Sequence, residues 1–429
     1  MFSQLKKFWK SLGPGLVTGA ADDDPSGIAV YAIAGAKFGL AVLWTALATL
    51  PFIIVIERMA GRIGLISGRG LAGNMKRHYP QWMLVSITLM LAGSTIINIG
   101  ADIAGMAAAL NLLIPFPPIF LSALISGTIT LLLIFLSYRH IAKYLKWVAI
   151  VLFSYIIAAF LVSEPWKEIA YRTFVPQIIF SKDYLAIIVA IFGTTISPYL
   201  FFWQASEVVE EERVHHHLKG DVSMIPSTKP PKSYHSPAIL KNEIGFMYND
   251  LYYGMAFSNI ITFFIIVLSA ATLHANGFFN VTTIEEIAQI LKPLAGPYAN
   301  LLFLVGLVAS GILAIPVLAG SAAYAISEVF GWREGFDNNF SSAKGFYFIL
   351  VASTLLGLLI PALGLHPVKI LYYTAIIFGV ISPFVILLVI HMANNPKIMG
   401  KFTSRNYSNV IAYVLFLVMS ASVILMLVL

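Results

Sequence analysis

The chain has 429 residues, of which 59% are hydrophobic and only 11% are charged. Soluble domains carry about 25% charged residues, so this composition excludes a soluble protein and predicts an integral membrane protein. The sequence contains no cysteine, which excludes disulfides, thiolate metal sites and iron–sulfur chemistry. The net charge of +7 does not indicate a nucleic-acid partner, because the basic residues gather in the loops of one membrane face.

Long apolar segments alternate with short polar loops, which is typical of membrane-spanning helices and not of a β-barrel. The sequence therefore predicts an all-α protein with about eleven spans, and we expect no removable signal peptide before the first span. The predicted spans are residues 13–36, 40–57, 81–108, 115–137, 144–163, 184–206, 246–272, 297–328, 345–363, 370–391 and 408–429.

Most of the 27 lysines and arginines fall in alternate loops, beginning with the N-terminal segment. By the positive-inside rule, the N-terminus is cytoplasmic and the C-terminus lies outside the inner (plasma) membrane. The longest hydrophilic interval, about 207–243, then lies in the cytoplasm between spans 6 and 7. Its three histidines, 215–217, are interpreted as part of a solvated loop, with a metal-binding cluster as the alternative.

Three consecutive carboxylates, Asp22, Asp23 and Asp24, interrupt the first span and are followed at once by Pro25-Ser26-Gly27. One charged side chain at bilayer depth costs roughly 2.5–3.5 kcal/mol on the insertion scale. The proline removes a backbone donor, and Ser-Gly permits unwinding, so the preceding carbonyls lose their helical partners. Free carbonyls beside carboxylates predict a cation site.

Span 6 contains a second interruption, where Gly193, Thr194 and Thr195 lead to Pro198. Either proline alone indicates a kink more often than a site. Breaks in spans 1 and 6 occupy equivalent positions, however, if spans 1–5 (about 13–163) and spans 6–10 (about 184–391) are inverted repeats. The whole chain, 1–429, then forms one transmembrane domain with an extra eleventh span at about 408–429.

These motifs resemble those of the NRAMP divalent-metal transporters, which have a LeuT-like fold. Their first span carries Gly-Pro-Gly and then Asp-Pro-Gly-Asn, and here GPGL at 13–16 precedes Asp24-Pro25-Ser26-Gly27. Their sixth span carries Gly-Ala-Thr-Val-Met-Pro-His, which matches residues 193–199. The runs at 101–104 in span 3 and 306–314 in span 8 are also similar, so the resemblance covers spans 1–10.

The resemblance implies that Asp24, Gly27, Thr194 and Ser197 surround the transported ion, with helices 1 and 6 unwound at mid-membrane. In the family, the Gly27 position is an asparagine and the Ser197 position a methionine, whose soft thioether favours Mn²⁺ and Fe²⁺ over hard cations. A family glutamine of span 10 is replaced by Ala375. An all-oxygen, roomier site suits Mg²⁺, which keeps several waters. The variant motifs are similar to those of the NRAMP-related magnesium transporters of prokaryotes.

Proton-coupled members of the family use two histidines after the span-6 proline and an acidic residue in span 3. Those positions hold Tyr199, Gln204 and Gly105, none of which titrates near neutral pH. We therefore expect uptake of Mg²⁺, and also of Mn²⁺, by alternating access without proton coupling. The nearby Asp102 is interpreted either as part of the transport route or as a buried residue that is hydrogen-bonded between helices.

Asp22 and Asp23 are rotated by about 200° and 100° from Asp24 on a helix, so the three carboxylates cannot all face one ion unless the segment unwinds. We expect Asp24 to contact the ion. Asp22 and Asp23, together with Thr195 and Tyr199, are expected to line its aqueous route or to hold its outer-shell water. The alternative for the two aspartates is hydrogen bonding between helices.

Three other functions compete with this prediction. The nearest is a proton-coupled Mn²⁺/Fe²⁺ importer of the same family. A sodium-coupled solute symporter of the same fold is disfavoured by Asp24, because an anionic centre suits a cation better than a carboxylate-bearing solute. An intramembrane aspartyl protease is disfavoured because its Tyr-Asp and Gly-x-Gly-Asp contexts are absent from the sequence. We expect no enzymatic activity, no cofactor beyond the transported ion, and no partner besides that ion and the lipid bilayer.

Overall fold

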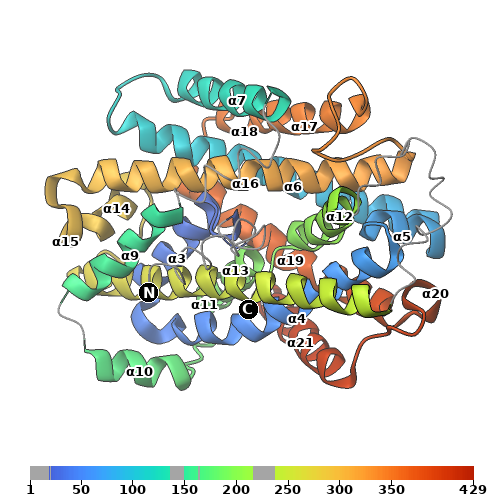
Figure 1. Cartoon of the computed structure of the whole chain (residues 1–429). Helices are drawn as coiled ribbons and strands as arrows, with labels where there is room; N and C mark the ends of the chain where they lie inside the picture. Colours follow the sequence, from blue (N-terminus) through green and yellow to red (C-terminus); the bar gives the residue numbers. More distant parts are fainter. Residues whose placement is uncertain (1–18, 20, 136–148, 163–164, 216–236) are drawn as a thin grey trace, which may run out of the picture.

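A computed structural model of the chain describes residues 19, 21–135, 149–162, 165–215 and 237–429 (Figure 1). This part of the chain is helical and contains no β-strand. Nine helices in it are long and apolar enough to cross a membrane, and the shorter apolar helix Val151–Leu161 adds to them. Each predicted span overlaps a helix of the described residues, so the predicted all-α membrane fold is confirmed.

The helices that correspond to predicted spans 1–5 form the first repeat, and those of spans 6–10 form the second. The first repeat comprises α3 (Pro25–Phe38), α4 (Trp44–Ser67), α6 (Gln81–Asn111), α7 (Pro118–Phe135) and α9 (Ala149–Leu161). The second comprises α11 (Lys182–Thr195) with α12 (Pro198–His215), α13 (Pro237–Thr272), α16 (Ala299–Phe330), α17 (Lys344–Gly357) and α19 (Pro367–Asn394), and α21 (Asn406–Val428) follows it. Short connecting helices include α5 (Leu71–His78), α10 (Trp166–Phe174), α14 (Ile284–Ala288), α18 (Leu359–Ala362) and α20 (Pro396–Met399).

The two repeats pack against each other reciprocally. The first helix of repeat one, α3, packs on the second helix of repeat two, α13, while the equivalent pair α12 and α4 makes the same contact in reverse. The third helices, α6 and α16, pack on each other. Such an exchange of equivalent contacts is what two related halves around a central axis produce, and it brings both interrupted helices to the middle of the molecule.

Glycines permit the closest of these contacts. A Cβ at Gly64 of α4 would overlap the carbonyl group of Ala205 in α12, and a Cβ at Gly35 of α3 would lie 2.5 Å from the carbonyl oxygen of Ile266 in α13. Both glycines therefore let a helix of one repeat touch the backbone of the other, as small residues do in membrane helix packing. The matched positions hold the two interrupted helices at a fixed distance from their partners.

The remaining helices form the periphery. In Figure 1, α7 and α17 lie together on the outer side of α6 and α16, whereas α4, α11 and α21 lie on the opposite side of the molecule. Helix α21 packs on α19 and α11 and leaves most of its surface exposed, which suits contact with lipid. The central position of α3, α11 and α12 leaves them almost completely covered by other helices.

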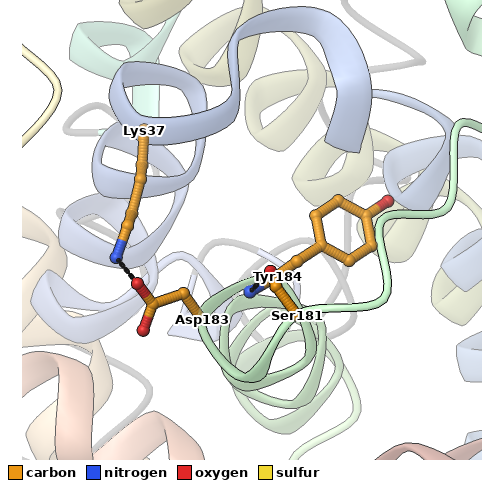
Figure 2. Close-up of polar contacts among 4 residues, drawn as sticks. All are labelled: Lys37, Ser181, Asp183 and Tyr184. Carbon is orange, nitrogen blue, oxygen red and sulfur yellow. Dashed lines mark hydrogen bonds and ion pairs between the residues drawn. The ribbon is translucent and has the colours of Figure 1, made fainter.

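An ion pair links α3 and α11 at their outer ends, which are the ends that lie away from the two breaks. Lys37 near the end of α3 forms an ion pair with Asp183 in the first turn of α11, with Nζ 2.7 Å from Oδ2 (Figure 2). Ser181 precedes α11 and its side chain accepts a hydrogen bond from the backbone nitrogen of Tyr184, so it caps the helix. Because the Asp183 side chain is 68% exposed, the ion pair aligns the two helices with little net stabilisation.

The hydrophilic interval 207–243 is partly helical. Helix α12 continues to His215, and α13 begins at Pro237, well before the predicted start of span 7. Residues 216–236 lie outside the described part of the chain, and with them two of the three histidines for which a metal cluster was the alternative interpretation. Residues 13–18 and 20 of predicted span 1 are likewise outside it.

Candidate cation site

The first break places Asp24 at the start of a half-helix. Asp24 has an extended backbone (φ −68°, ψ 170°) and precedes α3, whose first residue is Pro25. Its Oδ1 accepts hydrogen bonds from the backbone nitrogen of Gly27 and from Oγ of Ser26, both at 2.6 Å. Proline has no backbone N–H, and the first residue of a helix has no use for one. The Asp24 carboxylate accepts the hydrogen bond of the Gly27 backbone N–H, which has no acceptor within the helix. The motif Asp-Pro-Ser-Gly therefore builds its own helix start and fixes one carboxylate there.

The second break lies between α11 and α12, where Ile196 and Ser197 leave the helical conformation. Oγ of Ser197 lies 2.7 Å from the carbonyl oxygen of Thr194 and 2.9 Å from that of Gly193, to which it donates. Ser382 of α19 donates to the freed carbonyl oxygen of Ile196 at 2.9 Å. A hydroxyl has one proton and two lone pairs, so Ser197 keeps its lone pairs available for a cation.

The two breaks meet at Gly27. A Cβ at Gly27 would lie 3.1 Å from Oγ1 of Thr194 and 3.4 Å from Oδ1 of Asp24. One turn further along α3, the hydroxyl of Tyr31 is hydrogen-bonded to Oγ1 of Thr195 at 3.0 Å. The structure thus brings the predicted residues Asp24, Gly27 and Thr194 together, and the absence of a side chain at Gly27 permits this close approach.

Asn98 of α6 links this centre to Asp102, and the sequence interpretation missed it. Its Nδ2 donates to Oδ2 of Asp24 at 2.8 Å and lies 3.3 Å from Oδ2 of Asp102. Asn98 and Asp102 are four residues apart on one helix and therefore share a face. That spacing was the available signal, because an asparagine one turn from a membrane-buried aspartate has few other polar neighbours.

Asp22 and Asp23 belong to a neighbouring polar group. Both accept a hydrogen bond from Oγ of Ser258 in α13, at 3.0 Å to Asp22 and 3.1 Å to Asp23. Their other carboxylate oxygens, Oδ1 of Asp22 and Oδ2 of Asp23, are buried without a hydrogen-bond partner among the described residues. Ser258 is a second residue that the sequence did not single out, since nothing in span 7 marks one serine above the others.

Tyr199 also lies in this region, in the first turn of α12. Its side chain is buried, its ring packs against Phe378 with 5.4 Å between ring centres, and its hydroxyl has no partner in the described part of the chain. The place of Tyr199 on the ion route stays a prediction.

Residues at the other positions that depart from the family pattern lie around the centre. A Cβ at Gly193 would overlap the carbonyl oxygen of Ala375, so α11 touches α19 at that point. Gly105 of α6 faces α19, since a Cβ at Gly105 would lie 3.0 Å from Cδ1 of Leu371. Gln204 is buried on α12, and its Oε1 has no partner among the residues that the structure describes.

The donor groups at the centre are all oxygen atoms. They are the carboxylate of Asp24, the hydroxyls of Thr194 and Ser197, and the unpartnered amide oxygen Oδ1 of Asn98. No group of three histidine or acidic side chains converges as a ready-made metal cluster in the described part of the chain. One carboxylate with neutral oxygens is the donor set of a hard divalent cation that retains part of its water.

The fold and this centre define a multi-pass helical membrane protein whose two repeats cross at a polar, carboxylate-bearing middle. The family model described as "Natural resistance-associated macrophage protein-like" (Nramp) matches residues 15–429. The chain therefore belongs to the Nramp family, as the sequence motifs had indicated.

Two named relatives match this chain along most of their length. The chain is 24% identical over 411 residues to the divalent metal cation transporter MntH of Caldanaerobacter subterraneus, covering 93% of this chain and 88% of the relative. It is also 24% identical to the MntH protein of Ralstonia nicotianae, with 97% and 90% covered.

Among solved structures, the Eremococcus coleocola manganese transporter superposes with a TM-score of 0.77 at 15% identity, over 97% of this chain and 86% of that one. MhsT in complex with L-phenylalanine superposes with a TM-score of 0.59 at 13% identity, over 97% and 98% of the two chains. At these identities the likeness establishes the fold alone, and it confirms the predicted LeuT-like architecture.

Proposed function

We propose that this protein takes up divalent cations across the membrane by alternating access, with Mg²⁺ as its main substrate and Mn²⁺ also carried, and without proton coupling. The named relatives are transporters of divalent metal cations and of manganese, which supports the substrate class. The choice of Mg²⁺ rests on the residues of this chain, and the protein acts as a transporter and not as an enzyme.

A single observation carries the proposal: Asp24, fixed by Gly27 and Asn98, stands beside Thr194 at the junction of the two breaks, with oxygen donors around it. Mg²⁺ is held through one or two carboxylates and several retained waters. Gly27 has no side chain and adds no ligand of its own, which leaves coordination positions to such waters, and the Ser197 hydroxyl offers a hard donor where a thioether would favour softer ions.

The membrane potential supplies enough energy for uptake without a second ion. A doubly charged ion gains about 4.6 kcal/mol per 100 mV, twice the value for a single charge. This corresponds to a concentration ratio of more than a thousandfold at equilibrium, since every 1.4 kcal/mol is a factor of ten. In a cell whose membrane is negative inside, that force drives cations inward, whichever way the protein is oriented.

Asp24→Ala in proteoliposomes tests the proposed site. We expect Mg²⁺ and Mn²⁺ uptake under an inside-negative potential to fall to the background of empty liposomes, because Asp24 is the one carboxylate among the proposed ligands. Asp183→Asn, which removes an acidic group at the outer ends of α3 and α11, is the matched control and should transport normally. Near-normal flux through Asp24→Ala would place the substrate site elsewhere.

The second candidate is a proton-coupled Mn²⁺/Fe²⁺ importer. It is favoured by the MntH relatives and by the unpartnered oxygen of Asp102, a carboxyl group that is able to bind a proton. A pH-sensitive dye enclosed in the liposomes separates the two. We expect Mg²⁺ and Mn²⁺ to enter without acidification, whereas a proton signal in fixed ratio to metal entry would establish coupling.

A further inference from the structure

Glu57 is a buried carboxylate that the candidate site does not use. It lies on α4, its side chain is 0% exposed, and both Oε1 and Oε2 are without a hydrogen-bond partner among the residues that the structure describes. An ionised carboxylate in an apolar interior is strongly disfavoured unless a counter-charge or hydrogen bonds compensate it. The complete burial of the Glu57 carboxylate therefore requires an explanation.

The basic residues on the same helix do not neutralise Glu57. The guanidinium of Arg58 lies over the ring of Tyr248, 3.7 Å from its centre. Arg62, just over one turn further, donates from Nη2 to the carbonyl oxygen of Phe402 at 2.6 Å. Both cations on this stretch of α4 are thus engaged with other groups.

The neighbours of Glu57 are polar or acidic instead. Asp22 and Glu207, a buried carboxylate on α12, both lie within electrostatic range of Glu57. Gln204 packs against the same helix, since a Cβ at Gly61 would lie 3.4 Å from its Cγ and 3.5 Å from its Nε2. Gly61 is one turn beyond Glu57, so Gln204 packs on the face of α4 that also carries Glu57.

The two half-helices show on which side of the candidate site these polar residues lie. Asp22 precedes the break that ends at Asp24, and Glu207 lies nine residues beyond Pro198, about 13 Å along α12 at 1.5 Å per residue. In the predicted orientation both positions are on the cytoplasmic side of the centre. Acidic groups therefore continue from the candidate site toward the cytoplasm, while the outer side carries the Lys37–Asp183 ion pair.

From the proposed function, we infer that Glu57, Gln204 and Glu207 form an inner cation station, where a partly hydrated divalent cation pauses between Asp24 and the cytoplasm. Two carboxylates and the unpartnered Oε1 of Gln204 supply hard oxygen donors for such an ion. A second station lowers the barrier to release, because the ion exchanges one set of carboxylates for the next. Conduction needs sites that bind well enough for entry and weakly enough for exit.

The test uses the purified full chain with Mn²⁺ as the probe, measuring equilibrium binding by calorimetry and flux in proteoliposomes. Glu57→Gln should bind Mn²⁺ with a Kd within about twofold of the unchanged protein but transport it at least tenfold more slowly. Asp183→Asn should match the unchanged protein in both measurements. Unchanged flux through Glu57→Gln would overturn the inner station.

Asp24→Ala tests the proposed central site independently of this inference. Loss of Mn²⁺ binding in Asp24→Ala supports the central site whatever the result of the Glu57 variants.

If Glu57→Gln does not purify as a monodisperse protein, Glu57→Asp takes its place in the test. Its shorter carboxylate should slow flux about threefold at unchanged Kd, and normal flux would overturn the station. A pH-sensitive dye enclosed in the liposomes tests whether Glu57 carries protons instead. A proton signal that accompanies Mn²⁺ entry and disappears in Glu57→Gln would show that Glu57 is a proton carrier and not part of a cation station.

Discussion

Nδ2 of Asn98 lies 2.8 Å from Oδ2 of Asp24, so an amide on α6 holds the one carboxylate that stands between the two helix breaks. The same amide lies 3.3 Å from Asp102. Asn98 therefore positions Asp24 from outside both interrupted helices and couples it to a second buried acid. Its removal leaves Asp24 with donors from its own helix start only.

Asn98→Ala should weaken divalent-cation binding. A hydrogen bond to a charged group contributes about 1.5–3 kcal/mol, which corresponds to a roughly 10- to 100-fold higher Kd for Mn²⁺ if the bond acts only in the ion-bound geometry. Calorimetry on the purified protein measures this. Asn111→Ala is the control on the same helix, because Asn111 is half-buried at the end of α6 and donates to the carbonyl oxygen of Phe116 in the following loop. Equal affinities of the two variants would contradict the role of Asn98.

Ser197→Met should change ion selectivity toward Mn²⁺. The thioether supplies a soft donor at the junction, so we expect the ratio of Mn²⁺ to Mg²⁺ flux to rise at least tenfold. The change also removes the hydroxyl that donates to Gly193 and Thr194. Ser382→Ala, which uncaps the Ile196 carbonyl without adding sulfur, controls for that loss and should affect both ions equally. Competition uptake measures the ratio, and an unchanged ratio in Ser197→Met would refute the softness argument.

Gly27→Asn should make the centre smaller and add an amide oxygen. The built Cβ at Gly27 lies 3.1 Å from Oγ1 of Thr194, so that side chain must shift by a few tenths of an ångström. It lies 3.4 Å from Oδ1 of Asp24 and from Cε2 of the Tyr31 ring, which is ordinary contact. We expect tighter Mn²⁺ binding and several-fold slower Mg²⁺ uptake, since displaced water is costlier for Mg²⁺. Gly27→Ala adds the Cβ without the amide. If Gly27→Ala reproduces the Mn²⁺ gain, steric crowding and not ligation is responsible.

Gly64→Ala should destabilise the contact between the repeats. The added methyl would overlap the backbone carbonyl of Ala205, which cannot rotate away as a side chain can. Overpacking of this kind costs typically 1–3 kcal/mol, so the thermal unfolding midpoint in detergent should fall by several degrees. Gly127→Ala makes the same change on α7, where the built Cβ meets nothing within 4 Å, and should leave the midpoint level or slightly higher. Equal midpoints would show that α4 and α12 adjust freely.

Local chemistry made several features predictable from the sequence. A proline after three carboxylates cannot continue a membrane helix without freeing carbonyls, so Pro25 and Pro198 marked the two breaks. The span positions followed from hydropathy, because the bilayer forces every backbone group into a helix. The juxtaposition of Asp24, Gly27 and Thr194 required one more step, the equivalence of spans 1 and 6 in two repeats.

The sequence alone determined that this is a two-repeat membrane protein with an acidic centre at two broken helices, because such breaks are encoded within a few consecutive residues. Only the tertiary structure decided which distant groups complete that centre. Asn98 lies 74 residues from Asp24, and Ser258 lies 236 residues from Asp22. An ordinary asparagine or serine on an apolar helix has no local signature. Glu57 lies at the end of a predicted span, where a polar residue is common, and only the tertiary structure shows that it is buried. Their roles arise from helix packing, which fixes rotation and depth and which no short stretch of sequence specifies.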